Sequence, residues 1–136
     1  MANPRYLSRE GEATVELLMK LYNAKKVYFE NLNYFCKKEF VDKTSLENIE
    51  KVYLVGSHAE ENKWNDSTSD IDFKLVNSLA IPENLFRYKR KFLDPILCSS
   101  KRKRDWIDLY FVREDYQVTY PRWDLTQDWN KIQINC

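Results

Sequence analysis

The chain has 136 residues, 43% hydrophobic and 15% aromatic, which is enough to bury one core and predicts a single domain. Its 22 lysines and arginines nearly balance 21 aspartates and glutamates, so bulk charge does not indicate nucleic-acid or membrane binding. No apolar run approaches the length of about 20 residues that a membrane span needs, and no signal core begins the chain, so we expect a soluble, unexported protein.

The first predicted element is one long amphipathic helix over about residues 8–40, because apolar residues recur there at helical spacing without proline. Its length leaves two interpretations, a helix packed on a sheet or a helix offered to a partner subunit. A turn at residues 42–45 follows, and Ser45 is the expected N-cap of a short helix over residues 46–50.

Two strands are predicted next. Residues 52–55 form a continuous apolar run that ends at Gly56, which is typical of a buried, central strand. The polar residues 58–69 predict a short helix and then a loop. Residues 70–76 alternate between polar and apolar side chains, the pattern of a half-buried strand, so Asp70, Asp72 and Lys74 are expected on one face.

The second half of the chain predicts a helix, a strand and a tail. The helix spans residues 82–97 and should break or kink at Pro95. The strand spans residues 105–112, with Asp108 on the face opposite its apolar residues. The aromatic tail, residues 116–136, has no clear periodicity, and we expect it to pack against the sheet or a partner, since exposed tryptophans are costly.

These elements predict an α/β fold with a small mixed β-sheet of at least three strands. The helices, including the long N-terminal helix, should flank one face, and the acidic side chains should point toward the open face. One domain is expected over residues 1–136, with its core at residues 46–113.

The cysteine and histidine content argues against several kinds of site. Cys36, Cys98 and Cys136 are odd in number and widely separated, which favours a reducing, cytoplasmic compartment over a disulfide framework. His58 is the only histidine, so a zinc site of clustered His and Cys is not expected. A serine triad is not expected either, because no Gly-x-Ser-x-Gly elbow is present.

Three aspartates within predicted strands, Asp70, Asp72 and Asp108, indicate a metal site. Strands are depleted in aspartate, and an unpaired buried carboxylate is costly. Magnesium offsets that cost, because it prefers oxygen ligands and completes its shell with substrate phosphates. Two such ions would stabilise both the attacking and the leaving oxygen of a phosphoryl transfer.

A phosphate-binding turn is expected beside these aspartates. Gly56 follows a strand and lets backbone amides approach a phosphate, and the Ser57 hydroxyl adds a donor. Lys74 shares the face of the aspartates and would neutralise them or contact phosphate. His58 is either a phosphate donor or a simple polar surface residue, and Lys63 likewise has either a role at the site or none beyond the surface.

In these residues the chain resembles the minimal nucleotidyltransferases of the DNA polymerase β superfamily. Their signature is a hydrophobic residue, Gly, Gly or Ser, a spacer of roughly a dozen, and Asp-h-Asp-h, where h is hydrophobic. Here it reads Val55-Gly56-Ser57, twelve residues, then Asp70-Ile71-Asp72-Phe73. The third acidic residue of the family, on a later strand, corresponds to Asp108. The resemblance covers about residues 50–113.

The resemblance implies transfer of a nucleoside monophosphate from a nucleoside triphosphate, with ATP the expected donor, to a hydroxyl of a protein or RNA. Asp70 and Asp72 would hold the nucleotide-side Mg²⁺, with Mn²⁺ as an alternative. Asp108 would share a second ion and help to deprotonate the acceptor. Gly56 and Ser57 would hold the β and γ phosphates.

The sequence departs from the family after the phosphate turn. Many members have a second glycine there, whereas this chain has His58-Ala59-Glu60-Glu61, and the two glutamates suggest altered substrate geometry or reduced activity. The alternative function is a non-catalytic, antitoxin-like module of a toxin–antitoxin system that binds its partner without transfer. In relatives that partner is often a helical HEPN ribonuclease, which the transferase modifies.

The sequence does not identify the acceptor of the transferred nucleotide or the base of that nucleotide. The segment Arg87–Arg104 has a local net charge of +7 and the rest of the chain −6, so it could steer a nucleotide or an RNA acceptor, or simply form a solvated face. Nothing chooses the base, although Tyr110, Tyr120 or Trp123 could stack one.

Overall fold

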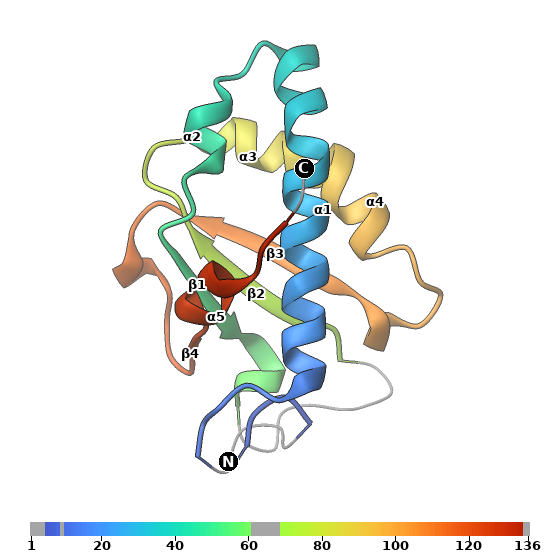
Figure 1. Cartoon of the computed structure of the whole chain (residues 1–136), viewed down its shortest axis with the longest axis vertical. Coiled ribbons are helices and arrows are strands. Elements are labelled where there is room, and N and C mark those ends of the chain that lie inside the picture. Colours follow the sequence, from blue (N-terminus) through green and yellow to red (C-terminus); the bar gives the residue numbers. More distant parts are fainter. Residues whose placement is uncertain (1–4, 9, 61–68, 135–136) are drawn as a thin grey trace.

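A four-stranded mixed sheet in the order β3-β2-β1-β4 forms the centre of the molecule (Figure 1). β1 (Lys51–Val55) is antiparallel to both β2 (Ile71–Val76) and β4 (Trp123–Asp124), and β2 is parallel to β3 (Ile107–Val112). The computed structural model describes the following residues: 5–8, 10–60 and 69–134. The predicted α/β class and mixed sheet are confirmed.

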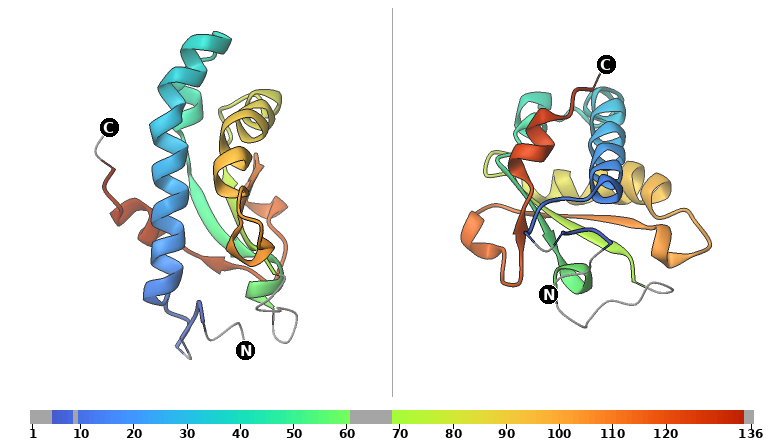
Figure 2. Two further views of the ribbon diagram at one scale, coloured as in Figure 1. Left: turned by 90° about the vertical axis from the view of Figure 1, so that its right-hand side faces the viewer. Right: turned by 60° about the horizontal axis from the view of Figure 1, so that its bottom comes forward.

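The helices lie on one side of the sheet, with α1 (Val15–Glu39) crossing it (Figure 2). α1 starts later than predicted, because the Thr14 hydroxyl accepts a hydrogen bond from the Leu17 backbone amide and caps the helix there. The helix ends at Phe40, whose backbone is left-handed with φ 56°. Its buried face is made of Leu17, Leu21, Ala24, Val27, Tyr28, Leu32, Phe35 and Cys36.

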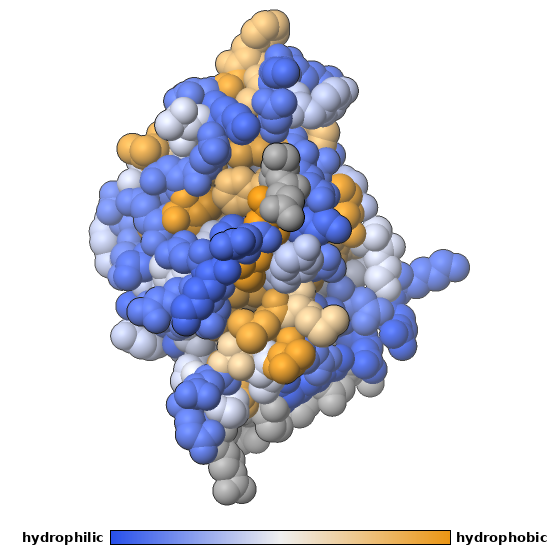
Figure 3. All heavy atoms as spheres, in the orientation of Figure 1, coloured by the Kyte–Doolittle hydropathy of each residue, from blue (hydrophilic) through white to orange (hydrophobic). Residues whose placement is uncertain are grey.

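The first of the two interpretations of the long helix, packing on a sheet, is therefore confirmed. The opposite face of its first half exposes Val15 and Met19, with 75% and 67% of their surface accessible. Figure 3 shows hydrophobic atoms over this lower end of the helix. A partner subunit on this face stays a prediction.

The predicted short helix is shifted by three residues. α2 (Lys43–Glu47) is capped by Asp42, whose carboxylate accepts from the Thr44 amide, so the expectation of Ser45 as N-cap was wrong. The Ser45 hydroxyl instead donates to the Asp42 carbonyl. An aspartate is as good a cap as serine, and its earlier position decides where the helix begins.

The helix predicted over residues 82–97 is continuous but not uniform. It consists of α3 (Pro82–Tyr88), a π-helical turn η2 (Lys89–Leu93) and α4 (Asp94–Leu97). Pro95 lies in the first turn of α4, where its missing amide is least costly. The helix does not end before this proline; the preceding turn is wider than an α-helical turn. This π-turn directs Lys89 toward β3, as described below.

The aromatic tail packs on the rest of the chain, as predicted, but it is more regular than expected. β4 pairs with β1, and α5 (Thr126–Lys131) contacts α1. Trp129 is buried at 2% exposure, and the Lys25 ammonium donates to the carbonyl oxygens of Trp129 and Ile132. Tail and long helix therefore share one core.

The two faces of the sheet differ in what covers them. The helix-covered face carries Leu54, Phe73 and Leu109, all at 0% exposure. The opposite face has a small apolar cluster of Tyr53, Val55, Val76 and Val118 and then opens onto the acidic side chains. No described helix is both long and apolar enough to cross a bilayer. Cys36 and Cys98 are free thiols, and Cys136 lies outside the described residues.

Candidate active site

The three predicted aspartates lie together at one end of the sheet. Asp72 on β2 and Asp108 on β3 are direct partners in the parallel register, so their side chains point to the same face. Asp70 immediately precedes β2. One carboxylate oxygen from each of the three residues lies within 4.8 Å of the others. Residues separated by more than thirty positions thus form one acidic group.

Gly56 lies against this group because β1 runs antiparallel to β2 and ends beside Asp72. Its φ of +75° is left-handed, and a Cβ atom there would lie 2.4 Å from Asp72 Oδ2. Only glycine lets the β1 turn and the Asp72 carboxylate approach so closely. Glycine at this position was predicted to let backbone amides approach a phosphate. The structure shows a second reason, the close approach of the Asp72 carboxylate.

One carboxylate oxygen of Asp72, Oδ1, is buried and has no hydrogen-bond partner among the residues that the structure describes. A buried carboxylate oxygen without a donor is costly unless a cation contacts it. All three side chains offer hard oxygen atoms, the ligand type that Mg²⁺ prefers. The donor set and the orphaned oxygen therefore fit the predicted magnesium.

The electrostatics of the group reflect crowded negative charge. Burial, together with a hydrogen bond to Asp108 and its charge, raises the pKa of Asp70 to about 6. Burial, with the charges of Asp70 and Asp108, raises the pKa of Asp72 to about 7. Burial also acts on Asp108, but the hydrogen bond from Asp70 and the charge of Lys89 hold its pKa below the usual range.

These pKa shifts predict an unusual pH dependence for the metal-free protein. Asp70 and Asp72 bind protons more tightly when folded than when unfolded, so the free energy of unfolding should decrease as pH rises from about 4 to 7. After allowing for solvent screening, we expect a loss of roughly 2 kcal/mol. Thermal unfolding between pH 4 and 8 measures it, and Mg²⁺ should restore stability at pH 8 but not at pH 5. A melting temperature that rises steadily over this range would contradict the shifts.

A cavity of about 450 Å³, within the range of small-molecule sites, opens beside Asp72, whereas Asp70 and Asp108 are not among its lining residues. Gly56, Asp72 and Lys74 line it, which brings three of the predicted residues to one wall. Glu60 lines it too, so the negative charge expected near the phosphate turn is present. Ser57 belongs to the 3-10 turn η1 (Gly56–Ala59) but, in the part of the chain that the structure describes, is not among the lining residues.

His58 is placed differently from both of its interpretations. It is 1% exposed, its ring meets the Tyr6 ring edge-on at 4.8 Å, and its Nε2 lies 3.2 Å from the Ser69 carbonyl oxygen. The expectation of a polar surface residue was wrong, because the 3-10 turn directs this side chain into the interior. Lys63 lies outside the described residues.

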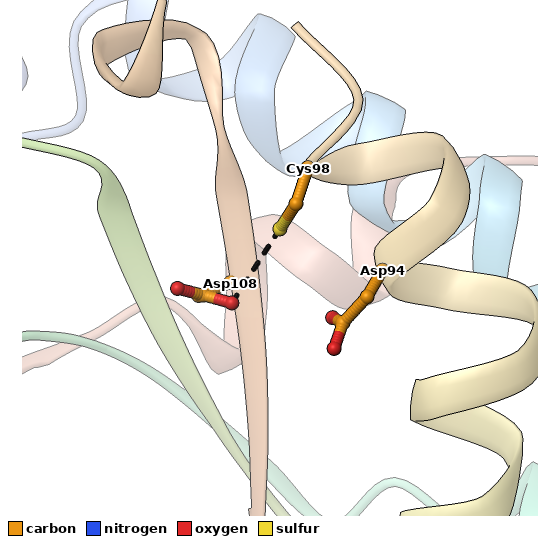
Figure 4. A group of neighbouring side chains, drawn as sticks. All are labelled: Asp94, Cys98 and Asp108. Carbon is orange, nitrogen blue, oxygen red and sulfur yellow. Dashed lines mark hydrogen bonds between the residues drawn. The ribbon is translucent and has the colours of Figure 1, made fainter. Parts of the chain in front are cut away.

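A second group of side chains, not expected from the sequence, reaches Asp108 around the edge of β3 (Figure 4). Asp94 and Cys98 of the α4 region lie close enough to Asp108 for the three to share an ion. The Lys89 ammonium already lies between them, 2.8 Å from Asp94 Oδ1 and 3.4 Å from Asp108 Oδ1. Burial and the Asp108 charge raise the pKa of Cys98 to about 12, so the thiol stays protonated and donates to Asp108.

Sequence reasoning missed these contacts for a physical reason. Lys89 appeared only as one cation of the segment Arg87–Arg104, and nothing in its neighbours distinguishes it. The π-turn and the packing of α3 beside β3 bring it to Asp108, and neither has a local sequence signal.

A further cavity, of about 660 Å³, adjoins the first one and shares Lys74 and Tyr110 with it. Its wall is largely apolar, with Leu85, Phe86 and Phe111, and Arg113 lies at its side. Lys74 and Tyr110 therefore lie at the border between the two cavities.

Several basic side chains of the segment Arg87–Arg104 form ion pairs with acidic side chains. Arg87 and Lys91 both pair with Glu39, at 3.7 Å and 2.9 Å, and Arg102 pairs with Asp105 at 3.1 Å. With Lys89 engaged as well, half of the eight basic residues of the segment have acidic partners.

Comparison of the chain with protein-family models, with curated proteins and with solved structures finds no match. Membership of the nucleotidyltransferase family therefore stays a prediction, supported by the motif and by the geometry of the three aspartates.

Proposed function

We propose that the chain is a metal-dependent nucleotidyltransferase that moves a nucleoside monophosphate from ATP or another nucleoside triphosphate to a hydroxyl group. One observation carries the proposal: Asp70, Asp72 and Asp108, from two adjacent strands, bring their oxygens within 4.8 Å of one another beside Gly56. Acidic groups on strands are avoided unless a cation or a reaction needs them.

Asp70, Asp72 and Asp108 would hold Mg²⁺, and the orphaned Oδ1 of Asp72 gives one ligand atom. A bound magnesium ion supplies charge neutralisation for the phosphates and for the developing charge of the transfer. Lys74, on the same face of β2, adds a fixed positive charge in the cavity wall. The amide-rich turn at Gly56 is the place for the terminal phosphates.

The reaction proposed is a single displacement at the α-phosphorus. The acceptor oxygen forms a bond to phosphorus, the bond from phosphorus to the bridging oxygen breaks, and pyrophosphate leaves with the electron pair. The acceptor proton goes to Asp108. That carboxylate is ionised at neutral pH and has an oxygen to accept the proton, although its lowered pKa makes it a weak base.

Calorimetry tests the binding half of this proposal. We expect ATP to bind only when Mg²⁺ is present, and Asp70→Asn to weaken that binding by at least about 100-fold because one ion loses a charged ligand. Asp128→Asn on α5 makes the same chemical change outside the site and should have no effect. Equal ATP affinity with and without magnesium would overturn the proposal.

A second candidate function, partner binding without transfer, is favoured by one contact. The Lys89 ammonium is 3.4 Å from Asp108 Oδ1, an oxygen of the residue that would share a second ion, so it already supplies positive charge to that carboxylate. An antitoxin-like module bound to a HEPN-type partner would need no second ion. If ATP binds but no phosphate label moves from α-labelled ATP to any acceptor, this candidate replaces the enzyme.

Acceptor class is tested by the same labelled nucleotide. Incubation with bulk RNA and with proteins that co-purify with the chain separates RNA from protein acceptors, and mass spectrometry locates the added nucleotide.

A further inference from the structure

One aromatic ring stands exposed beside the acidic group. Tyr120 has 80% of its surface accessible, yet it lines the same cavity as Gly56 and Asp72. Thr119 and Pro121 line the cavity with it, so the chain segment before β4 forms the wall opposite the sheet. Most of the apolar surface of this ring is therefore accessible.

The Tyr120 ring is held in place from one side. The Arg122 guanidinium lies over it, with Cζ 5.0 Å from the ring centroid, and also over the buried Tyr53 ring at 4.6 Å. Arg122 Nη1 donates to the carbonyl oxygens of Asp115 and Val118, both at 3.2 Å. The segment is thus fastened to β1, and Tyr120 keeps one face open.

The other two rings that could stack a base are already engaged. The Lys89 ammonium covers Tyr110, 4.9 Å from its ring centroid, and Tyr110 is only 41% exposed. Trp123 donates from its indole nitrogen to the Ala59 carbonyl, and its ring packs against Gly11, where an added Cβ would lie 2.8 Å away. Tyr110 lines the same cavity as Tyr120 but is only 41% exposed against 80%, so Tyr120 offers the larger accessible ring surface there.

We propose that Tyr120 is the stacking platform for the base of the bound nucleotide, with Arg122 as the residue that positions it. This inference rests on the proposed function, which brings a nucleoside triphosphate to the cavity. Base–aromatic stacking needs one free ring face, which Tyr120 has, and the Arg122 guanidinium over the other face favours one orientation of the ring. The base would lie over Tyr120 while the phosphates extend past Lys74 toward Gly56 and Asp72.

The test compares ATP with inorganic tripolyphosphate, which has the triphosphate but no base. Both are titrated by calorimetry in the presence of Mg²⁺ into the wild-type chain, Tyr120→Ala, Tyr120→Trp and Tyr116→Ala. Tyr116 is the matched control, since it is a tyrosine of the same segment with 81% exposure and lines none of the cavities described above. Both tyrosines are exposed, so neither alanine variant should unfold.

We expect Tyr120→Ala to raise the Kd for ATP about 5- to 100-fold, the usual effect of losing one stacked base, and to leave the Kd for tripolyphosphate unchanged. Tyr120→Trp should retain ATP binding, and Tyr116→Ala should match the wild type. Arg122→Lys should weaken ATP but not tripolyphosphate, because the ring loses its support.

Four results would overturn the inference. Unchanged ATP affinity in Tyr120→Ala would remove the stacking role, and an equal loss for ATP and tripolyphosphate would show that Tyr120 only shapes the phosphate site. Wild-type protein that binds tripolyphosphate as tightly as ATP would leave the proposed function standing without this base site. Wild-type protein that binds neither compound would overturn both.

Discussion

Asp72→Asn should reduce magnesium-dependent ATP binding at least about 100-fold and, at the same time, make the metal-free protein more stable at pH 8. Both effects come from the same buried charge. Asp72 has a pKa of about 7 because burial and two neighbouring carboxylates oppose its ionisation. An asparagine keeps the shape, removes that repulsion and cannot replace a carboxylate ligand.

Thermal unfolding and calorimetry on one set of samples measure the two effects of Asp72→Asn together. We expect the melting temperature without metal to rise at pH 8 and to change little at pH 5, where the wild-type Asp72 is already protonated. Asp128→Asn is the control for a general effect of charge removal. A variant that loses stability at pH 8 would mean that Asp72 is stabilised by a partner, contrary to the electrostatics described.

Gly56→Ala should destabilise the protein by about 2–4 kcal/mol, among the larger effects of a single substitution. Its φ of +75° disfavours any side chain, and the new Cβ would lie 2.4 Å from Asp72 Oδ2 and 3.2 Å from Cγ. To relieve the contact, β1 and β2 would separate or Asp72 would rotate away from Asp108. We therefore expect metal-dependent ATP binding to be lost as well.

A double-mutant cycle separates backbone strain from the contact with Asp72. In an Asp72→Ala background, Gly56→Ala should cost only the left-handed backbone term of about 1–2 kcal/mol, because the opposing carboxylate is gone. Gly11→Ala, at φ +77° against the Trp123 ring, is the comparison for a strained glycine outside the site and should leave ATP binding intact. Denaturant unfolding measures the coupling, and strictly additive effects would show that Gly56 and Asp72 do not interact.

Lys74 and Lys89 differ in whether the local sequence pattern could predict their contacts. Lys74 is predicted on the face of the aspartates by alternation along one strand, and it lies in the wall of their cavity. Lys89, in a helical segment, contacts Asp108 directly, but only because a π-turn and the packing of α3 bring it there. Alternation in a strand fixes a face, whereas the reach of a helix side chain depends on where the helix is docked.

Local patterns were enough to predict three of the four strands, the long helix, the α/β class and the three acidic residues, because hydrophobic periodicity and the positions of proline and glycine are local properties. The two-residue strand β4 was not predicted, because it is too short to show a period. Only the tertiary structure decided that Asp70, Asp72 and Asp108 converge, that Gly56 touches Asp72 and that Tyr120 lines the cavity. These contacts follow from strand order and register. Both are set by the whole core, since a one-residue shift of β3 would turn Asp108 to the buried face.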